Sequence, residues 1–207
     1  MSATHVPGRD HYTTLRYDTK KRWCSYWHQV DETLAVSPSS VLIVGVGSGI
    51  VPAYLRWLGI AVTTLDIVNE LEPDLVGDVR AVPVDDAAFD VAVCCQVLEH
   101  LELAQVPAAL SELARVARRR VVISIPRRGR YWEVAIRIPP LPRFAWGGVL
   151  PNRRRYDGDP EHHWELGPRA VPRAHFEELF AEHLALERTY HVPEHPYHEF
   201  FVGRPVR

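Results

Sequence analysis

The sequence predicts an α/β fold of the Rossmann-like kind. The first observation behind this prediction is a strand, a glycine turn and a helix in direct succession. Residues 41–44 are apolar, and three glycines follow at positions 45, 47 and 49. Apolar residues then recur at helical spacing over 50–58, and Gly59 provides a helix stop. Such a unit typically begins an open α/β domain that binds a nucleotide-like ligand.

The second observation is the alternation of strands and helices from residue 41 to residue 125. Apolar strand segments at 61–66, 89–95 and 121–125 are separated by helical patterns, the clearest of which spans 106–117. Such alternation indicates a parallel sheet with right-handed crossovers. The length of 207 residues suits one domain with a full core, so we expect a single domain over 1–207.

Composition and charge argue against several classes of protein. The formal net charge of -2 gives no overall attraction to nucleic acid. The three cysteines are too few and too irregularly spaced for a disulfide scaffold or a zinc site. No apolar run fits a signal peptide or a membrane span of about 20 residues. These features predict a cytoplasmic protein.

The spacing of the glycines separates two classes of nucleotide ligand. A dinucleotide fingerprint, G-x-G-x-x-G, would need a third glycine where the chain has Ile50 or Pro52. The pattern present is G-x-G-x-G. Glycine adopts positive φ readily and lets a ligand approach the backbone closely. The spacing therefore disfavours a nicotinamide oxidoreductase.

Two acids follow strands of the predicted sheet. Asp66 ends the strand at 61–66, where a carboxylate can accept hydrogen bonds from both ribose hydroxyls. Asp78 follows a short strand at 75–76, and it either accepts from an adenine amino group or belongs to a solvated turn. Gln96 is the first polar group after the strand at 89–95. These positions indicate a bound nucleoside without naming it.

Residues 41–125 carry these features in order and add a run from Phe89 that ends in Val-Leu-Glu-His-Leu at 97–101. The sequence thus resembles the methyltransferase type 11 group of the class I S-adenosylmethionine-dependent methyltransferases. The resemblance implies a three-layer sandwich with a mostly parallel seven-stranded sheet and a C-terminal antiparallel hairpin. It also implies S-adenosylmethionine as cofactor and S-adenosylhomocysteine as product.

The resemblance also assigns residues to the cofactor. The glycine turn would pass under the amino-acid part, Asp66 would hold the ribose, and Asp78 with Val79 would hold the adenine. One position departs from the pattern, because Ile43 stands where many relatives have an acid near the methionine ammonium group. The full expected set is Gly45, Val46, Gly47, Ser48, Gly49, Asp66, Ile67, Asp78, Val79, Gln96, Val97 and Arg22.

Residues 1–40 form the expected N-terminal segment, with a helix over 19–35 that Asp18 caps. We expect this helix either to pack on the sheet or to form a lid over the cofactor. In a lid, arginine and tyrosine side chains such as Arg22 can bind a carboxylate. The apolar stripe of the helix is Trp23, Trp27, Val30 and Leu34.

Residues 41–125 are the expected cofactor-binding core, and 126–169 are the expected substrate cap. The stretch 115–155 holds one acid, Glu133, and twelve arginines. The interpretations left open for this stretch are a solvated cap, a site for an anionic substrate, peripheral contact of 127–155 with a lipid surface, and contact with a single-stranded nucleic acid. For the chain as a whole a nucleic acid is not favoured, since no recognition domain is appended. The arginines are Arg115, Arg118, Arg119, Arg120, Arg127, Arg128, Arg130, Arg137, Arg143, Arg153, Arg154 and Arg155.

Histidines supply the candidates for a general base. His162 and His163 lie in Glu-His-His-Trp-Glu-Leu-Gly at 161–167, and His100 stands behind them as a third candidate. A histidine near the transferred methyl group can take a proton from the acceptor. A structural histidine bonded to backbone is the alternative. We expect no metal, because adjacent residues seldom converge on one ion.

Residues 170–207 are expected to close the domain. A helix striped by Phe176, Leu179, Phe180 and His183 precedes strands at 184–191 and 199–202. Three histidines near these strands either line the mouth of the site or cap the sheet edge. They are His191, His195 and His198.

The favoured function is methyl transfer to a small-molecule acceptor that is anionic or linked to a lipid or sugar. The alternative is a fold relative that binds S-adenosylmethionine but has a non-methylating or regulatory role, and Ile43 gives it weight. The sequence predicts neither the atom that is methylated nor the oligomeric state.

Overall fold

The structure is a computed structural model that describes residues 8–142, 144–151, 161–167 and 171–206. Parts of the predicted terminal and cap segments lie outside the described residues, and so do Arg143, Arg153, Arg154 and Arg155.

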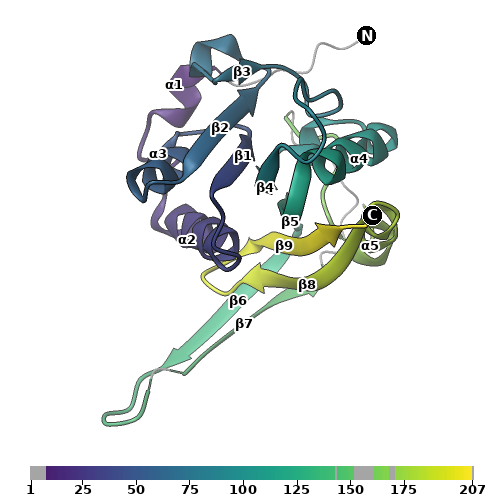
Figure 1. Ribbon diagram of the computed structural model, residues 1–207. Coiled ribbons are helices and arrows are strands. Elements are labelled where there is room, and N and C mark those ends of the chain that lie inside the picture. The colour runs from purple at the N-terminus through teal and green to yellow at the C-terminus, as the bar shows by residue number, and fades with distance from the viewer. Residues whose placement is uncertain (1–7, 143, 152–160, 168–170, 207) are drawn as a thin grey trace.

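A seven-stranded sheet in the order β3-β2-β1-β4-β5-β9-β8 forms the centre of the molecule (Figure 1). β1 to β5 are parallel, and β9 is antiparallel to both β5 and β8. This confirms the mostly parallel sheet with its C-terminal hairpin. The strands are β1 (Ser40–Val44), β2 (Ala61–Asp66), β3 (Leu75–Val76), β4 (Phe89–Cys95), β5 (Ala117–Pro126), β8 (Leu184–Val192) and β9 (His195–Pro205).

Helices cover both faces of the sheet, which confirms the predicted three-layer sandwich (Figure 1). α2 (Lys20–Leu34) and α3 (Ile50–Trp57) lie on one face, and α4 (Val106–Val116) and α5 (Arg173–Ala181) lie on the other. No helix among the described residues is both long and apolar enough to cross a membrane. The short helices are α1 (Arg9–Tyr12) and three 3₁₀ turns, η1 (Asn69–Leu71), η2 (Leu98–His100) and η3 (Leu103–Gln105).

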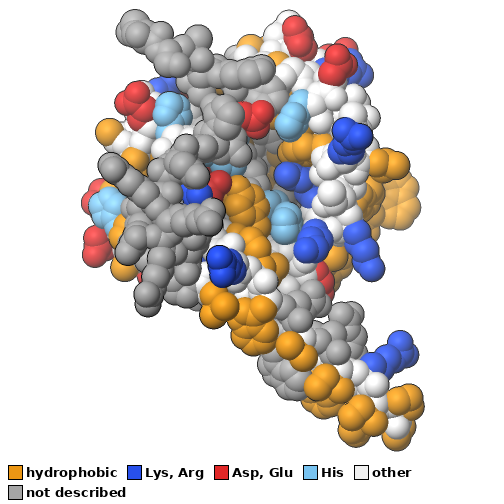
Figure 2. Space-filling view, turned by 180° about the vertical axis from the view of Figure 1, so that it is seen from behind, with side chains coloured by type: hydrophobic (Ala, Val, Ile, Leu, Met, Phe, Trp, Pro, Cys, Tyr) orange, Lys and Arg blue, Asp and Glu red, His pale blue; other side chains and the backbone are white. Residues whose placement is uncertain are grey.

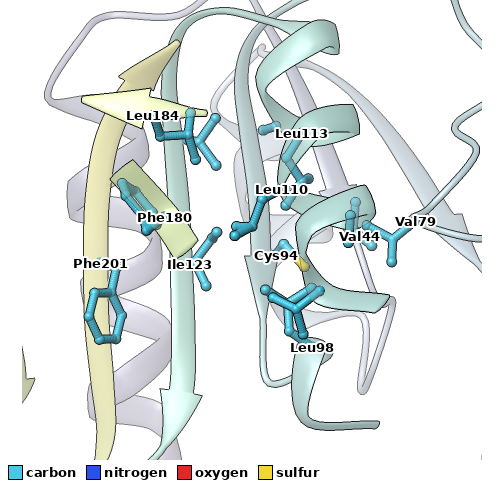
Figure 3. Close-up of a cluster of buried hydrophobic side chains, with 14 of the residues drawn as sticks. Val44, Val79, Cys94, Leu98, Leu110, Leu113, Ile123, Phe180, Leu184 and Phe201 are labelled. Carbon is cyan, nitrogen blue, oxygen red and sulfur yellow. The ribbon is translucent and has the colours of Figure 1, made fainter. Parts of the chain in front are cut away.

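Side chains of successive strand residues divide the core between the two faces. Ile123 of β5 packs with α4 and α5, whereas its neighbour Val122 belongs to the cluster beneath α2 and α3. Figure 3 shows Phe180 and Phe201 of the closing segment beside Ile123. Ile43 is 3% exposed and lies in the cluster beneath α2 and α3, so its side chain contributes to the core.

The helix α2 forms as predicted, but its orientation differs from the prediction. Trp23, Trp27 and Leu34 are 50%, 60% and 36% exposed, so these members of the predicted apolar stripe face solvent. Val30, its fourth member, packs against the core cluster. The cap also differs, because the Thr19 side chain accepts from the backbone N–H of Arg22 while Asp18 accepts from the hydroxyl of Tyr26. The buried face is polar and consists of Ser25, Gln29, Glu32 and Thr33.

Specific partners explain this polar buried face. Ser25 Oγ lies 2.6 Å from Nδ1 of His198, and Glu32 accepts from the hydroxyl of Tyr190 at 2.8 Å. Glu32 also pairs with Arg188, while Arg120 Nη1 lies 3.7 Å from Glu32 Oε2. Buried polar groups with such partners avoid the cost of desolvation. The helix therefore turns the side that finds hydrogen-bond partners on β8, β9 and β5 toward the sheet.

The cap segment contains an element that the sequence analysis did not predict. β6 (Gly129–Ile136) and β7 (Phe144–Pro151) pair as an antiparallel hairpin outside the main sheet. This hairpin projects from the body of the molecule (Figure 1). The prolines at 139, 140 and 142 lie in the connection between the two strands. Proline has no amide hydrogen to donate to a neighbouring strand, and residues of the connection do not take part in strand pairing. We call β6, β7 and their connection the arm.

Candidate active site

The glycine turn lies at the carboxyl end of β1, where ligands of open α/β sheets bind. Gly45 has a φ of 84°, and a Cβ atom there would stand 2.7 Å from Cγ2 of Val97. Gly47 and Gly49 also have positive φ. The turn therefore needs glycine at its first position for two reasons, which are backbone conformation and contact with the next loop.

Asp66 ends β2 beside this turn. Its carboxylate accepts from the backbone N–H of Val46 at 2.8 Å and from that of Val68 at 2.9 Å. These two bonds hold the side chain in place and use one lone pair on each oxygen. The remaining lone pairs can accept further hydrogen bonds, because an ionised carboxylate offers about four acceptor positions.

Asp78 is paired with a neighbour that the sequence analysis did not consider. Arg80 donates to it from its backbone N–H at 2.8 Å and from Nε at 2.9 Å. These hydrogen bonds from Arg80 lower the pKa of Asp78 below its usual range. The carboxylate is therefore ionised, and Arg80 already uses part of its hydrogen-bonding capacity. Any nucleobase that binds there shares the carboxylate with Arg80.

Gln96 and Val97 lie in the loop after β4. Gln96 has a φ of 58°, a conformation that residues other than glycine adopt rarely. Its backbone N–H donates to the carbonyl of Ser124 at 2.9 Å and its Nε2 donates to Ser124 Oγ at 3.2 Å. Ser124 of β5 thus holds both the backbone and the side chain of this strained residue. Strained backbone held in this way is concentrated at functional sites.

A cavity of about 510 Å³ lies over the glycine turn. It also contacts residues that the sequence analysis did not assign to the cofactor, among them Tyr12, Tyr17, Arg80 and Leu101. Val46, Ser48 and Gly49 do not line it, and Arg22 lines a neighbouring cavity. The expected cofactor residues that line it are Gly45, Gly47, Asp66, Ile67, Asp78, Val79, Gln96 and Val97.

The neighbouring cavity has a volume of about 620 Å³. Its walls are the N-terminal segment, the loop after β4, the stretch from Glu161 to His162, and β9. The guanidinium of Arg22 lies 4.0 Å from the ring centre of Tyr17, which places one cation over an aromatic ring in its wall. Four residues line both cavities, and they are Tyr12, Tyr17, Gln96 and His100.

The three candidate bases occupy different places. His100 and His162 line the larger cavity with their ring centres 5.0 Å apart. His163 is exposed and lines the smaller cavity. Nδ1 of His100 lies 2.6 Å from the carbonyl oxygen of Glu161. A carbonyl only accepts, so this Nδ1 carries a proton and the lone pair of the neutral ring is on Nε2.

His162 is oriented by a carboxylate. Its Nδ1 lies 3.0 Å from Oε1 of Glu165, and the hydroxyl of Tyr197 donates to the same oxygen at 2.7 Å. Glu165 is buried and Tyr197 lines the larger cavity. A base whose second nitrogen donates to a carboxylate has a fixed tautomer and orientation. The Glu165 contact therefore presents Nε2 of His162 as the proton-accepting atom.

Glu99 was missed by the sequence analysis. Its side chain is fully buried, and neither carboxyl oxygen has a hydrogen-bond partner among the described residues. Burial raises the pKa of Glu99 to about 8, while the charge on His162 acts in the opposite direction. Its position between Leu98 and His100, as an acid inside a run that forms a buried turn, was the available signal.

Glu99, His100 and His162 form a cluster. One ligand-type atom from each lies within 4.8 Å of the others. The sequence analysis set a metal aside because His162 and His163 are adjacent, but the structure brings together His162 and His100 from separate segments. Such a cluster can move protons or bind a cation. Among the other histidines, His195 lines the larger cavity, whereas His198 is buried against Ser25.

Comparison with known proteins finds a matching family model and solved structures with the same fold. The family described as "Methyltransferase domain" matches residues 42–125. The chain has the class I methyltransferase fold. No curated protein matches it.

Solved structures with this methyltransferase fold cover nearly the whole chain. A protein from Pyrococcus horikoshii OT3 has 15% identity and a TM-score of 0.63, with 95% of each chain covered. The Burkholderia thailandensis 1,6-didemethyltoxoflavin-N1-methyltransferase, solved with 1,6-didemethyltoxoflavin and S-adenosylhomocysteine, has 18% identity and a TM-score of 0.62 over 96% of this chain and 85% of that one. The N-methyltransferase NodS from Bradyrhizobium japonicum WM9, in complex with S-adenosylhomocysteine, has 12% identity and a TM-score of 0.63 over 92% and 90%. At these identities the likeness shows a shared fold alone.

Proposed function

We propose that the chain transfers a methyl group from S-adenosylmethionine to a small, hydroxyl-rich acceptor. The observation that carries the proposal is the pair of adjoining cavities. One lies over the glycine turn, the other is walled by His162, and Tyr12, Tyr17, Gln96 and His100 line both. A donor and an acceptor bound in this way meet at the shared wall, as transfer between them requires.

The smaller cavity fits S-adenosylmethionine. Gly45 and Gly47 line it without side chains, so a ligand can approach the backbone of the turn closely. Asp66 would bind the ribose, and Asp78 with Arg80 would bind the adenine end. When bound, this cofactor supplies a methyl group that its sulfonium already makes electrophilic. Two of the similar structures contain S-adenosylhomocysteine, which supports this choice.

The larger cavity favours a polar acceptor. The described residues that line it are polar or aromatic and include no aliphatic side chain. Cations such as Arg16 and Arg22 and acids such as Asp10 and Glu161 are both present. A wall with donors, acceptors and tyrosine rings suits a sugar-like molecule, whose hydroxyls bond to polar groups and whose C–H faces stack on rings.

His162 is the proposed general base. It lines the larger cavity, and Glu165 and Tyr197 orient its ring. With Nδ1 protonated, Nε2 of His162 would accept the proton of an acceptor hydroxyl. The oxygen could then bond to the methyl group that S-adenosylmethionine supplies, with S-adenosylhomocysteine as the leaving group. Glu165 stabilises the imidazolium that forms.

The first experiment is calorimetric titration with S-adenosylmethionine and S-adenosylhomocysteine. Asp66→Ala is expected to weaken both affinities at least about tenfold, because the ribose loses its acceptor and the turn loses its bond to Val46. Asp86→Ala is the control, because the Asp86 side chain is 80% exposed and lines neither cavity. Absence of binding to the unmodified chain would refute the cofactor assignment.

The second experiment tests the base by release of S-adenosylhomocysteine with a panel of sugar acceptors. His162→Ala is expected to reduce kcat by about 10²-fold or more, the usual contribution of a positioned base. His163→Ala is expected to change kcat by only a few-fold, because its side chain lines the other cavity. A similar small effect of His162→Ala would make the assignment wrong. Loss of turnover on chelation would instead assign the cluster of Glu99, His100 and His162 to a metal.

The alternative function is a cofactor-binding relative that does not methylate. The observation that favours it is Ile43, which lies in the apolar core and so provides no acid at the end of β1. Binding of S-adenosylmethionine without release of S-adenosylhomocysteine for any acceptor would support this alternative.

A further inference from the structure

The strand register divides the side chains of the arm between two faces. Ile136 pairs with Phe144, Trp132 with Gly148, and Arg130 with Leu150. Alternate residues of a strand point to the same side, and paired residues of antiparallel strands share a side. Among the side chains of the arm that the structure describes, five large apolar ones therefore lie on one side, which we call the apolar arm face: Trp132, Val134, Ile136, Phe144 and Leu150.

The side chains of this face that the structure describes are exposed. Trp132 and Phe144 are each 45% exposed, and Leu150 is 55% exposed. In the connection at the tip, Ile138 and Leu141 are 56% and 54% exposed. Figure 2 shows hydrophobic side chains along the projecting arm. An isolated two-stranded hairpin is marginally stable in water, and a contiguous apolar patch of this kind usually marks an interaction site.

The charge of the arm indicates what covers the face. Residues 129–151, which make up the arm, contain three arginines and a single acid, Glu133, although the chain as a whole has a net charge of -2. Arg130 stands near the base of the arm and Arg137 at its tip, and both are exposed. Cations at both ends of an apolar face match an anionic lipid surface, which attracts arginines at the headgroups and takes up aromatic and aliphatic side chains below them.

The hairpin geometry sets how the arm can meet lipid. Each strand has eight residues and spans about 26 Å. The outer edges of a two-stranded ribbon carry unpaired backbone groups, which cannot enter the hydrocarbon core without partners. The ribbon therefore has to lie flat in the interfacial layer, with the apolar arm face downward and its edges among headgroups and water.

We propose that the arm lies on an anionic lipid surface and holds the body of the molecule there. Tyr131 lies on the opposite face of the ribbon, and its ring centre is 6.3 Å from that of Tyr197, which lines the larger cavity. The base of the arm thus adjoins the acceptor cavity. Docking brings that cavity to the lipid surface, where an acceptor with a lipid attachment can reach it. Lipid binding by the arm does not depend on methyl transfer.

Co-sedimentation of the full chain with lipid vesicles tests the proposal. We expect binding to vesicles of mixed phosphatidylglycerol and phosphatidylcholine, and at least about tenfold weaker binding to phosphatidylcholine alone. Binding to the anionic vesicles is expected to weaken in high salt, because exposed charges are screened.

A matched pair of variants assigns the binding to the arm. Val134→Asp places a carboxylate on the apolar arm face and is expected to reduce binding to anionic vesicles at least about tenfold. Val206→Asp makes the same change on a 61% exposed side chain at the other end of the chain and is expected to bind within about twofold of the unmodified protein. Calorimetry with S-adenosylmethionine shows separately whether each variant retains its fold.

Three results would overturn the proposal. The first is no binding to anionic vesicles, and the second is equal binding by Val134→Asp and Val206→Asp. The third comes from light scattering of the chain in solution. If the chain is a dimer that Val134→Asp dissociates while vesicle binding persists, the apolar arm face is an interface between copies of the chain.

Discussion

At Gly45 the chain turns from β1 toward α3 with a φ of 84°, and the adjoining loop leaves no space for a Cβ atom. Gly59 has the same φ of 84° but has no atom within 4 Å of the corresponding Cβ position. Alanine variants at the two positions therefore separate the free-energy cost of the backbone conformation from the cost of the collision with Val97.

Gly59→Ala is expected to lower the free energy of unfolding by about 1–2 kcal/mol, because it forces alanine into the left-handed region. Gly45→Ala is expected to cost about 1–3 kcal/mol more, because its Cβ atom also collides with Val97. Gly45→Ala alone is expected to weaken S-adenosylmethionine binding at least about tenfold. Urea denaturation and calorimetry measure the two effects. Equal affinities for the two variants would show that the Gly45 turn does not contact the cofactor.

Neighbouring residues can serve different cavities. His162 faces the larger cavity and Glu165, whereas His163 faces the smaller cavity and donates its backbone N–H to the carbonyl of Glu99 at 2.8 Å. The sequence does not distinguish the two adjacent histidines, whereas the fold places them at different cavities.

At the scale of elements, α2 shows that the side of a helix with the large apolar residues is not always the side that packs against the sheet. Its tryptophans lie outside and its polar side chains lie inside, where Glu32 is 2% exposed and bonded to Tyr190. The polar contacts of Ser25 and Glu32 form against β9, β8 and β5, which are far away in sequence.

Glu32→Ala is expected to lower the free energy of unfolding by about 3 kcal/mol or more, because it leaves Arg188 and Tyr190 without their buried partner. Trp27→Ala on the same helix is expected to cost about 1 kcal/mol or less, because the Trp27 side chain is 60% exposed. Urea denaturation of both variants checks this order. The reverse order would mean that α2 packs through its aromatic stripe.

The stability of the whole molecule is expected to depend on pH through histidines of β9. Burial, together with the nearby charges of Arg22 and Lys21, lowers the pKa of His195 to about 4. In the unfolded chain a histidine has a pKa of about 6.5, so between these values the unfolded state binds more protons. Stability therefore falls as pH decreases from about 6.5 toward 4.

Between pH 7 and pH 5 the unmodified chain is expected to lose on the order of 1 kcal/mol more stability than His195→Gln, which has no proton to gain there. Urea denaturation at the two pH values measures this difference. His175→Gln, at an exposed position on α5, is the control and is expected to leave the pH dependence as it is. An equal loss in all three proteins would exclude His195 as the cause.

The sequence by itself determined the main sheet, the glycine turn and part of the lining of the smaller cavity. These features depend on local patterns: apolar runs make buried strands, glycines permit the turn, and parallel strands bring their carboxyl ends to one edge. Asp66, Asp78 and Gln96 therefore line the smaller cavity together, and their contact with the cofactor stays a prediction.

Only the tertiary structure decided which face of α2 is buried, that Arg80 pairs with Asp78, and that Glu99 lies beside His100 and His162. It also decided that the cap segment contains a projecting hairpin with one apolar face. Each of these results depends on partners that come from distant parts of the chain or on side-chain geometry. Local periodicity contains no information about which of those partners is within reach.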